Sequence, residues 1–196
     1  MSIMEQKKQI RQQMRQLRQG LEQAQLQDAS VGLCDQLEQL LTPGDYPLAI
    51  YQSFDSELGT DTFLSKALAH NRRILLPVVA GKGQPLVFRE YHEGMPLESN
   101  CYGIGEPLSG AICPLSEIKA ICLPLTAFDR QGGRLGMGGG YYDVTLASMN
   151  KRTQNTQPKL IGLGYEFQEV TSCPMEAHDQ RLDYVVTPSE IITISE

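Results

Sequence analysis

Residues 121–143 read ICLPLTAFDRQGGRLGMGGGYYD. The apolar run at 121–125 has the length of a buried strand, and a segment with six glycines follows it. A helix is expected to begin near Tyr141. A strand, a glycine-rich loop and a helix in this order are typical of α/β proteins, whose ligands gather at the carboxyl ends of parallel strands. The stretch therefore predicts both the fold class and the place of a ligand site.

Residues 134–142, called the glycine loop below, have the composition of a phosphate site. Glycine has no Cβ, so the backbone can turn several N–H groups toward an anion. Arg134 adds a donor fork that is always charged, and Asp143 adds an oxygen ligand of the kind Mg²⁺ binds. The loop has neither the Gly-Lys-Ser/Thr ending of a P-loop nor the dinucleotide spacing. We expect a nucleoside triphosphate site here, and a tight turn without a ligand is the alternative.

The composition is that of an ordinary globular protein, with 41% hydrophobic and 20% charged residues, and 196 residues suit one domain. The net charge of −6 argues against general nucleic-acid binding. Without a bilayer-length apolar run or the apolar centre of a signal peptide, the chain is expected to be cytoplasmic and to make no membrane contact. Five cysteines without metal-site clustering indicate buried or half-buried thiols.

The first twenty residues predict a basic amphipathic helix. Ser2 and Glu5 fit a capping box. Apolar side chains recur at helical spacing, at Ile10, Met14, Leu17 and Leu21. Basic side chains lie beside this stripe, at Lys7, Lys8, Arg11, Arg15 and Arg18. In an acidic protein this is a local patch for an anionic ligand, and a solvated basic face is the alternative.

The rest of the chain predicts strands that alternate with helices. A second helix is expected at about 22–41, followed by further helices at 61–70 and 141–149. Strand candidates lie at 48–51, 73–79, 86–91, 121–125, 160–165 and 184–187. Residues 150–157 form a polar loop. The order predicts a single α/β domain of three layers, with a largely parallel sheet flanked by helices.

Residues 123–143 closely resemble the signature of the 5-formyltetrahydrofolate cyclo-ligases, also called 5,10-methenyltetrahydrofolate synthetases. Four further segments match in the family's order: KKQIR at 7–11, SFDSELGT at 53–60, YGIGEP at 102–107 and HDQRLDYVVTP at 178–188. The resemblance implies an enzyme that uses ATP and Mg²⁺ to convert 5-formyltetrahydrofolate to 5,10-methenyltetrahydrofolate, with release of ADP and phosphate. The formyl oxygen would take the γ-phosphoryl group before N10 closes the ring, so no enzyme nucleophile is required.

The resemblance also implies ATP contacts in the basic helix and the glycine loop. These are Lys7, Lys8, Arg11, Arg134, Leu135, Gly136, Met137, Gly138, Gly139, Gly140, Tyr141 and Tyr142. Arg134 and Asp143 would serve catalysis, while Arg15 and Arg18 are expected at the surface. Met137 stands where other members often carry a basic residue, so one phosphate contact is expected to be missing.

Two carboxylates are expected to bind Mg²⁺ by the same resemblance, Asp143 and Asp183. Asp179 is a rival for the second position, and a strand-start residue in a salt bridge is the alternative reading of Asp183. The histidines, His70, His92 and His178, have no metal-ligand spacing.

Folate contacts are expected from Gln52, Phe54, Glu57 and Tyr142. Glu57 would accept hydrogen bonds from the pterin N–H groups. Gln52 and Phe54 are alternate residues of an extended segment, so they should face the same side, where Phe54 would pack on the pterin. A plain core aromatic is the alternative for Phe54, and Thr60 is expected to cap the next helix.

Two other functions suit a similar architecture. One is a non-catalytic folate or nucleotide sensor, and the other is a sugar-phosphate isomerase or CoA-transferase-like enzyme. An isomerase would need an acid–base pair at the strand ends and no triphosphate loop, whereas a sensor would not need Asp143 beside the phosphates. We therefore expect a monomeric enzyme whose partners are 5-formyltetrahydrofolate and ATP.

Overall fold

An eight-stranded sheet forms the centre of the computed structural model, which describes residues 2–147, 158–176 and 179–195. Its strands lie in the order β12 (Ile191–Thr193), β11 (Tyr184–Val186), β10 (Lys159–Leu163), β7 (Ala120–Pro124), β1 (Leu48–Ala49), β2 (Ile74–Val79), β3 (Leu86–Tyr91) and β6 (Ile112–Cys113). The neighbours from β11 to β2 pair in parallel, while β12, β3 and β6 pair antiparallel at the two edges. The predicted, largely parallel sheet is confirmed.

Both faces of the sheet are apolar because its central strands carry apolar side chains on both sides of the pleat. Leu48 and Ile74 are register partners that join one core cluster, while their neighbours Ala49 and Leu75 join the cluster on the opposite face. A sheet that is buried on both faces must be covered twice. This is the physical reason for a three-layer domain.

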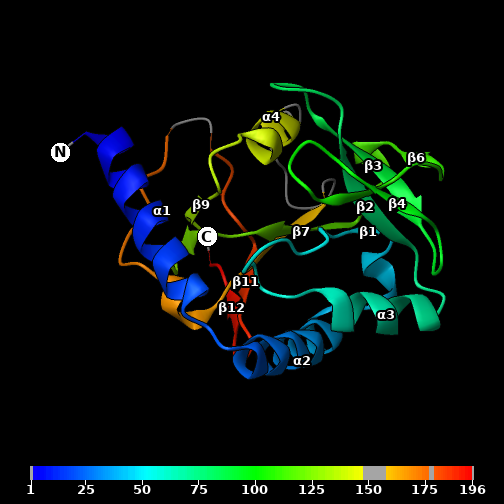
Figure 1. The fold of residues 1–196 in the computed structure, drawn as a ribbon, viewed down its shortest axis with the longest axis horizontal. Coiled ribbons are helices and arrows are strands. Elements are labelled where there is room, and N and C mark those ends of the chain that lie inside the picture. The colour runs from blue at the N-terminus through cyan, green and yellow to red at the C-terminus, as the bar shows by residue number, and fades with distance from the viewer. Residues whose placement is uncertain (1, 148–157, 177–178, 196) are drawn as a thin grey trace.

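Helices α2 (Gln23–Leu40) and α3 (Asp61–Ala69) cover one face, with Leu33, Leu37 and Phe63 in its core. Helix α4 (Tyr141–Ala147) covers part of the other face, and Figure 1 shows it across the sheet from α2 and α3. A small hairpin of β8 (Ala127–Phe128) and β9 (Arg134–Leu135) lies beside α1 (Ile3–Gln19). Helix α1 contacts β8 and the short 3₁₀ helix η3 (Glu166–Gln168).

Helix α1 begins as its sequence predicts. The Glu5 amide donates to the Ser2 hydroxyl at 3.3 Å, and the Ser2 amide donates to the Glu5 carboxylate at 2.8 Å. Thr60 stands at the N-cap position of α3, but its hydroxyl instead donates to the Tyr51 carbonyl at 2.9 Å. The expected N-cap position of Thr60 is confirmed, although its buried hydroxyl connects the segment after β1 to the start of α3 instead of bonding a helix amide.

The strands that sequence reasoning missed are short. They include β6, β8, β9, β12 and an antiparallel pair, β4 (Leu97–Ser99) with β5 (Gly105–Pro107). Two or three residues give no periodic pattern, so only their partners define them. Two further 3₁₀ turns, η1 (Pro43–Asp45) and η2 (Leu115–Glu117), complete the fold.

Some of the predicted segments lie partly or wholly outside the described residues. The predicted helix at 141–149 is described to Ala147, and positions 148 and 149, the polar loop at 150–157 and His178 lie outside the described residues. Four cysteines are buried free thiols as expected, whereas Cys101 is exposed. Among the described residues, every helix is too short or too polar to cross a bilayer.

Candidate active site

Helix α1 presents one face to the glycine loop. Lys7, Arg11, Met14 and Arg18 share this face because their spacings correspond to whole helical turns. The Arg11 Nε donates to the Gly136 carbonyl at 2.9 Å, and a Cβ placed on Gly138 would lie 3.5 Å from Arg11 Cζ. The fold therefore brings Arg11 onto a loop that is more than a hundred residues away in the sequence.

Arg18 lies on the same face and is only 2% exposed. Its Nη2 donates to the Met137 sulfur at 3.5 Å. The expectation that Arg18 lies at the surface is wrong, because its position one turn beyond Met14 turns it toward the protein. Arg15 and Lys8 are exposed, the former as expected.

Lys7 contacts acidic side chains near the C-terminus. Its Nζ lies 3.2 Å from Glu176 Oε1 and 3.8 Å from Asp179 Oδ2. Asp179, the rival candidate for the second metal contact, thus takes part in an ion pair with α1. These contacts fasten the start of α1 to the segment that follows Cys173, beside the glycine loop.

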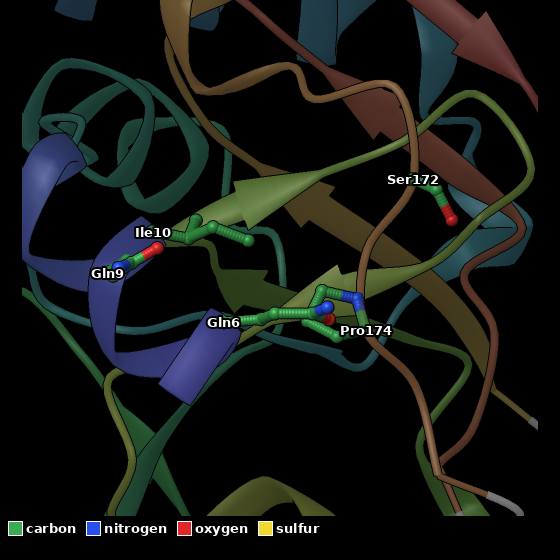
Figure 2. Close-up of a pocket in the computed structure, with 5 residues that line it drawn as sticks. All are labelled: Gln6, Gln9, Ile10, Ser172 and Pro174. Atoms are coloured by element: carbon green, nitrogen blue, oxygen red, sulfur yellow. The ribbon is translucent and has the colours of Figure 1, made fainter. Parts of the chain in front are cut away.

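An open pocket of about 330 Å³ lies on the flank of α1, between this helix and the same C-terminal segment. Figure 2 shows its lining residues, Gln6, Gln9, Ile10, Ser172 and Pro174. None of these five side chains is charged, which makes the pocket a poor site for a triphosphate.

The β8–β9 hairpin positions the start of the glycine loop. The buried Asp129 carboxylate accepts the amides of Gln131 at 2.9 Å, Gly133 at 2.8 Å and Cys173 at 2.7 Å. A Cβ on Gly133 would collide with this carboxylate. Asp129 therefore closes the hairpin and joins it to the C-terminal segment, a role that sequence reasoning did not assign.

Arg134 and Asp143 stand at the two ends of the glycine loop. The Arg134 Nη2 lies 2.5 Å from Asp143 Oδ1, with the Arg134 side chain 6% exposed and that of Asp143 38% exposed. Arg134 Nε is buried and has no hydrogen-bond partner among the residues that the structure describes. Between the two residues, Gly138 and Gly140 have φ of 107° and 70°, which only glycine adopts without strain. The loop thus folds back on itself and keeps a buried guanidinium at its base.

Tyr141 and Tyr142 face different partners. The Tyr141 hydroxyl lies 2.6 Å from the Tyr102 hydroxyl, and this hydrogen bond, with partial desolvation, raises the pKa of Tyr141 to about 12. Burial raises the pKa of Tyr142 further above its ordinary value, Glu57 adds to the rise and Arg134 opposes it. The two tyrosines therefore differ in their surroundings, since Tyr141 contacts Tyr102 while the charges of Glu57 and Arg134 act on Tyr142.

Glu57 carries a half-buried carboxylate on the segment between β1 and α3. Its Oε2 accepts the Phe54 amide at 3.1 Å. Burial raises the pKa of Glu57 above its ordinary value, although the Phe54 amide and the charge of Arg18 oppose the shift. The Tyr165 hydroxyl donates to the Glu57 carbonyl at 3.3 Å, so the structure joins Glu57 to a segment that follows β10.

Gln52 and Phe54 both face residues 103–105, as their alternation predicts. A Cβ on Gly105 would lie 2.7 Å from Gln52 Oε1, and one on Gly103 would lie 3.2 Å from Phe54 Cε2. Phe54 is 41% exposed, which excludes the core alternative and leaves its ring free to contact a ligand. Within the described part of the chain, the buried Gln52 Oε1 has no hydrogen-bond partner. It lies beside a pocket of about 130 Å³ that no glycine-loop residue lines.

Asp183 lies directly before β11, and the amide of its neighbour Leu182 donates to the Gly132 carbonyl of the β8–β9 hairpin at 3.0 Å. The Asp183 Oδ2 accepts the Leu160 amide at 2.7 Å, and the Asp183 amide donates to the Leu160 carbonyl at 2.9 Å. This is a strand-start role, close to the alternative considered above, and a magnesium contact stays a prediction. In the described part of the chain, no three His, Cys, Asp or Glu side chains gather where they could hold a metal.

The chain belongs to the 5-formyltetrahydrofolate cyclo-ligase family of enzymes, whose sequence profile matches residues 3–188. A 5-formyltetrahydrofolate cyclo-ligase of Escherichia coli is 38% identical over 152 residues, which are 74% of this chain and 80% of that protein. A relative of the same name from Haemophilus influenzae is 37% identical over 135 residues, 67% of this chain and 70% of its own length.

A solved structure supports the same assignment. The NMR structure of the 5,10-methenyltetrahydrofolate synthetase from Aquifex aeolicus has a TM-score of 0.82 to this chain at 26% identity, and the match covers 97% of this chain and 93% of that one. The expected family, fold and enzyme class are confirmed, and the isomerase alternative is excluded.

Proposed function

We propose that this protein closes 5-formyltetrahydrofolate to 5,10-methenyltetrahydrofolate in a reaction that consumes ATP and requires Mg²⁺. The observation that carries the proposal is the pairing of Arg134 with Asp143 across the glycine loop at 2.5 Å. It places a cation suited to phosphate beside a partly exposed carboxylate suited to Mg²⁺, which is the combination that a metal-bound triphosphate requires.

The triphosphate would lie along the glycine loop, with Arg11 and Arg134 as its guanidinium contacts. Arg11 already bonds the loop backbone through Nε, which orients the rest of its fork along the loop. Loop N–H groups of residues 136–140 would add neutral donors. Lys7 and Lys8 would contribute charge from the first turns of α1, although Lys7 would first have to share its contacts with Glu176.

Asp143 would hold Mg²⁺ together with the phosphates of ATP. The residues present fit this arrangement, because Mg²⁺ keeps several waters and usually needs one or two carboxylates plus substrate phosphates. A dedicated cage of protein ligands is therefore not required. When bound, the ion would neutralise phosphate charge during transfer.

The folate would occupy the side of Glu57, where Phe54 presents an exposed ring and the half-buried Tyr142 would add its hydroxyl. A half-buried carboxylate can accept hydrogen bonds from the pterin N–H groups, and burial strengthens that discrimination. Gln52 would act at the outer edge of this region. The charges of Glu57 and Arg134 both act on Tyr142, so we assign it a contact with each substrate.

The proposed reaction has two steps, phosphoryl transfer and ring closure, and the protein would promote both by positioning the reactants and stabilising charge. The formyl oxygen attacks the γ-phosphorus of ATP while the bond to the ADP oxygen breaks, and the electron pair leaves with ADP. N10 attacks the activated carbon, the C–O bond breaks, inorganic phosphate leaves, and N10 loses its proton to water. The protein holds the reactants in line and stabilises charge, which are the usual demands of phosphoryl transfer.

One experiment separates this function from that of a sensor. The purified protein is mixed with 5-formyltetrahydrofolate, ATP and Mg²⁺, and the absorbance of the methenyl product is followed, with each component omitted in turn. We expect product and ADP in equal amounts only in the complete mixture. Binding of both ligands without product would identify a sensor. The cytoplasmic location and the monomeric state stay predictions. Cell fractionation would test the location, and analytical sedimentation would test the oligomeric state.

A further inference from the structure

Arg18 is a buried cation without an anionic partner in the described residues. Its Nη2 donates to the sulfur of Met137, and its Nε is buried with no hydrogen-bond partner in residues 2–147, 158–176 and 179–195. A thioether is a weak acceptor, so this contact compensates little of the free energy lost when a guanidinium leaves water. An arginine in such surroundings is suited to bind an anion, and none of the described side chains pairs with it.

The surroundings of Arg18 point to where that anion would lie. Met137 belongs to the glycine loop, so one side of the guanidinium faces the proposed triphosphate. The charge of Arg18 also acts on Glu57 and Tyr165, although no ion pair joins Arg18 to Glu57 among the described residues. Helix α1 also contacts η3, and the hydroxyl of Tyr165, the N-cap residue of η3, donates to the Glu57 carbonyl at 3.3 Å, so Arg18 lies between the proposed ATP region and the proposed folate region.

We infer that Arg18 binds the phosphoryl group that passes from ATP to the formyl oxygen. The inference rests on the proposed function, and it adds a residue that neither the glycine loop nor the folate contacts include. As the γ-phosphorus leaves the ADP oxygen and bonds to the formyl oxygen, its three other oxygens keep their negative charge. A guanidinium fork at the junction of the two regions would hold that charge before and after the transfer.

Arg18 also accounts for a feature of the loop sequence. A phosphate contact was expected to be missing at Met137, and the structure places the Arg18 guanidinium against that side chain. The cation that the loop itself lacks is thus supplied from α1. The phosphate contact expected to be missing is replaced rather than lost.

The test compares Arg18→Met, Arg18→Lys and the control Arg15→Met. Methionine keeps an unbranched apolar stem in a buried place, lysine keeps the charge, and Arg15 is an exposed arginine of the same helix. Calorimetry measures the binding of ATP, ADP and 5-formyltetrahydrofolate, each with Mg²⁺, and turnover is measured with thermal unfolding of each variant.

We expect Arg18→Met to bind ATP roughly 10- to 100-fold more weakly while ADP and folate affinities change less than about 2-fold, because only ATP carries the terminal phosphoryl group. Its kcat should fall about 10²–10³-fold. The unliganded variant should unfold at or above the wild-type temperature, since a poorly paired charge has been removed. Arg18→Lys should recover part of both losses, and Arg15→Met should match the wild type.

Equal losses for ATP and ADP would overturn the inference, since Arg18 would then only shape the loop. A lower unfolding temperature with unchanged kcat would overturn it as well, by assigning Arg18 a structural role. If the wild-type protein formed no methenyl product, the proposed function would fail, yet the comparison of ATP with ADP would still decide the role of Arg18.

Discussion

The carboxylate of Asp143 lies 2.5 Å from the guanidinium of Arg134 and thereby joins the first turn of α4 to the end of the β8–β9 hairpin. The arginine is the buried member of the pair and the aspartate the exposed one. A phosphate arriving from solvent would therefore meet the carboxylate side first, and a metal ion at Asp143 would relieve the repulsion between the two anions. The pair suits a site that binds a metal nucleotide rather than a free anion.

Arg134→Ala should impair the use of ATP. One preorganised donor removed from a transferring group typically costs about 10²–10³ in rate, and here the buried cation at the base of the loop is lost as well. Steady-state kinetics with ATP as the varied substrate would measure the effect, and folate affinity should persist. Arg130→Ala is the matched control, because Arg130 lies on the same hairpin but pairs with Glu169 and Glu190 at the surface. An unchanged kcat/KM for ATP in folded Arg134→Ala would refute the phosphate role.

Asp143→Asn should lower kcat more than ATP affinity. The substitution is nearly isosteric but removes the charge that would anchor Mg²⁺, whose interaction with the phosphates is strongest during transfer. Turnover is followed against Mg²⁺ concentration at saturating ATP and folate, and raised Mg²⁺ should restore part of it. Asp28→Asn, an exposed position of α2, serves as the control. Wild-type turnover at low Mg²⁺ would assign Asp143 to the helix start alone and would favour Asp183 as the metal contact.

Glu57→Gln should weaken folate binding and leave ATP binding nearly unchanged. Exchange of a charged acceptor for a neutral amide typically costs about 1.5–3 kcal/mol where the hydrogen bonds are shielded from water. Calorimetry with each ligand separately would show the difference. Equal loss for both ligands would instead indicate a rearranged site, and an unaltered folate affinity would contradict the assignment.

Glu57→Gln should also change how the free energy of unfolding depends on pH. Burial holds the pKa of Glu57 above its value in the unfolded chain, so ionisation of Glu57 opposes folding at pH values above the unfolded pKa. Glutamine has no such ionisation. Unliganded Glu57→Gln should therefore be more stable than the wild type at pH 7 to about 8, and this gain should vanish below about pH 4. A gain that persists in acid would mean that the effect comes from packing.

Asp129→Ala should destabilise the fold without a direct effect on ligand contacts. It would leave three backbone N–H groups of the hairpin and the C-terminal segment without their shared acceptor. A loss of about 3 kcal/mol follows from buried unsatisfied donors, which lowers the unfolding temperature by roughly 6–12 °C for a domain of this size. Thermal unfolding would measure it, with Asp35→Ala, an exposed residue of α2, as control. Loss of less than about 1 kcal/mol would show that water replaces the carboxylate.

Much of the fold could be predicted because it depends on local patterns. Helices α1, α2 and α3 begin and end within a residue or two of their expected limits, since caps and apolar periodicity are local properties. Strands that alternate with helices along the sequence predicted a largely parallel sheet flanked by helices, which the structure confirms. The short edge strands could not be predicted, because pairing alone defines them.

The chemistry of the glycine loop was determined by the sequence itself. Glycines that need positive φ, an arginine and an aspartate at fixed spacing can only make a polar turn with charged ends, whatever surrounds it. Which side chains meet that turn was decided by the tertiary structure. Arg18 belongs to a row of similar arginines in the sequence, and only the docking of α1 on the hairpin buries it against Met137 while Arg15 stays in water. Contacts between distant segments depend on how whole elements pack, and no local pattern records that packing.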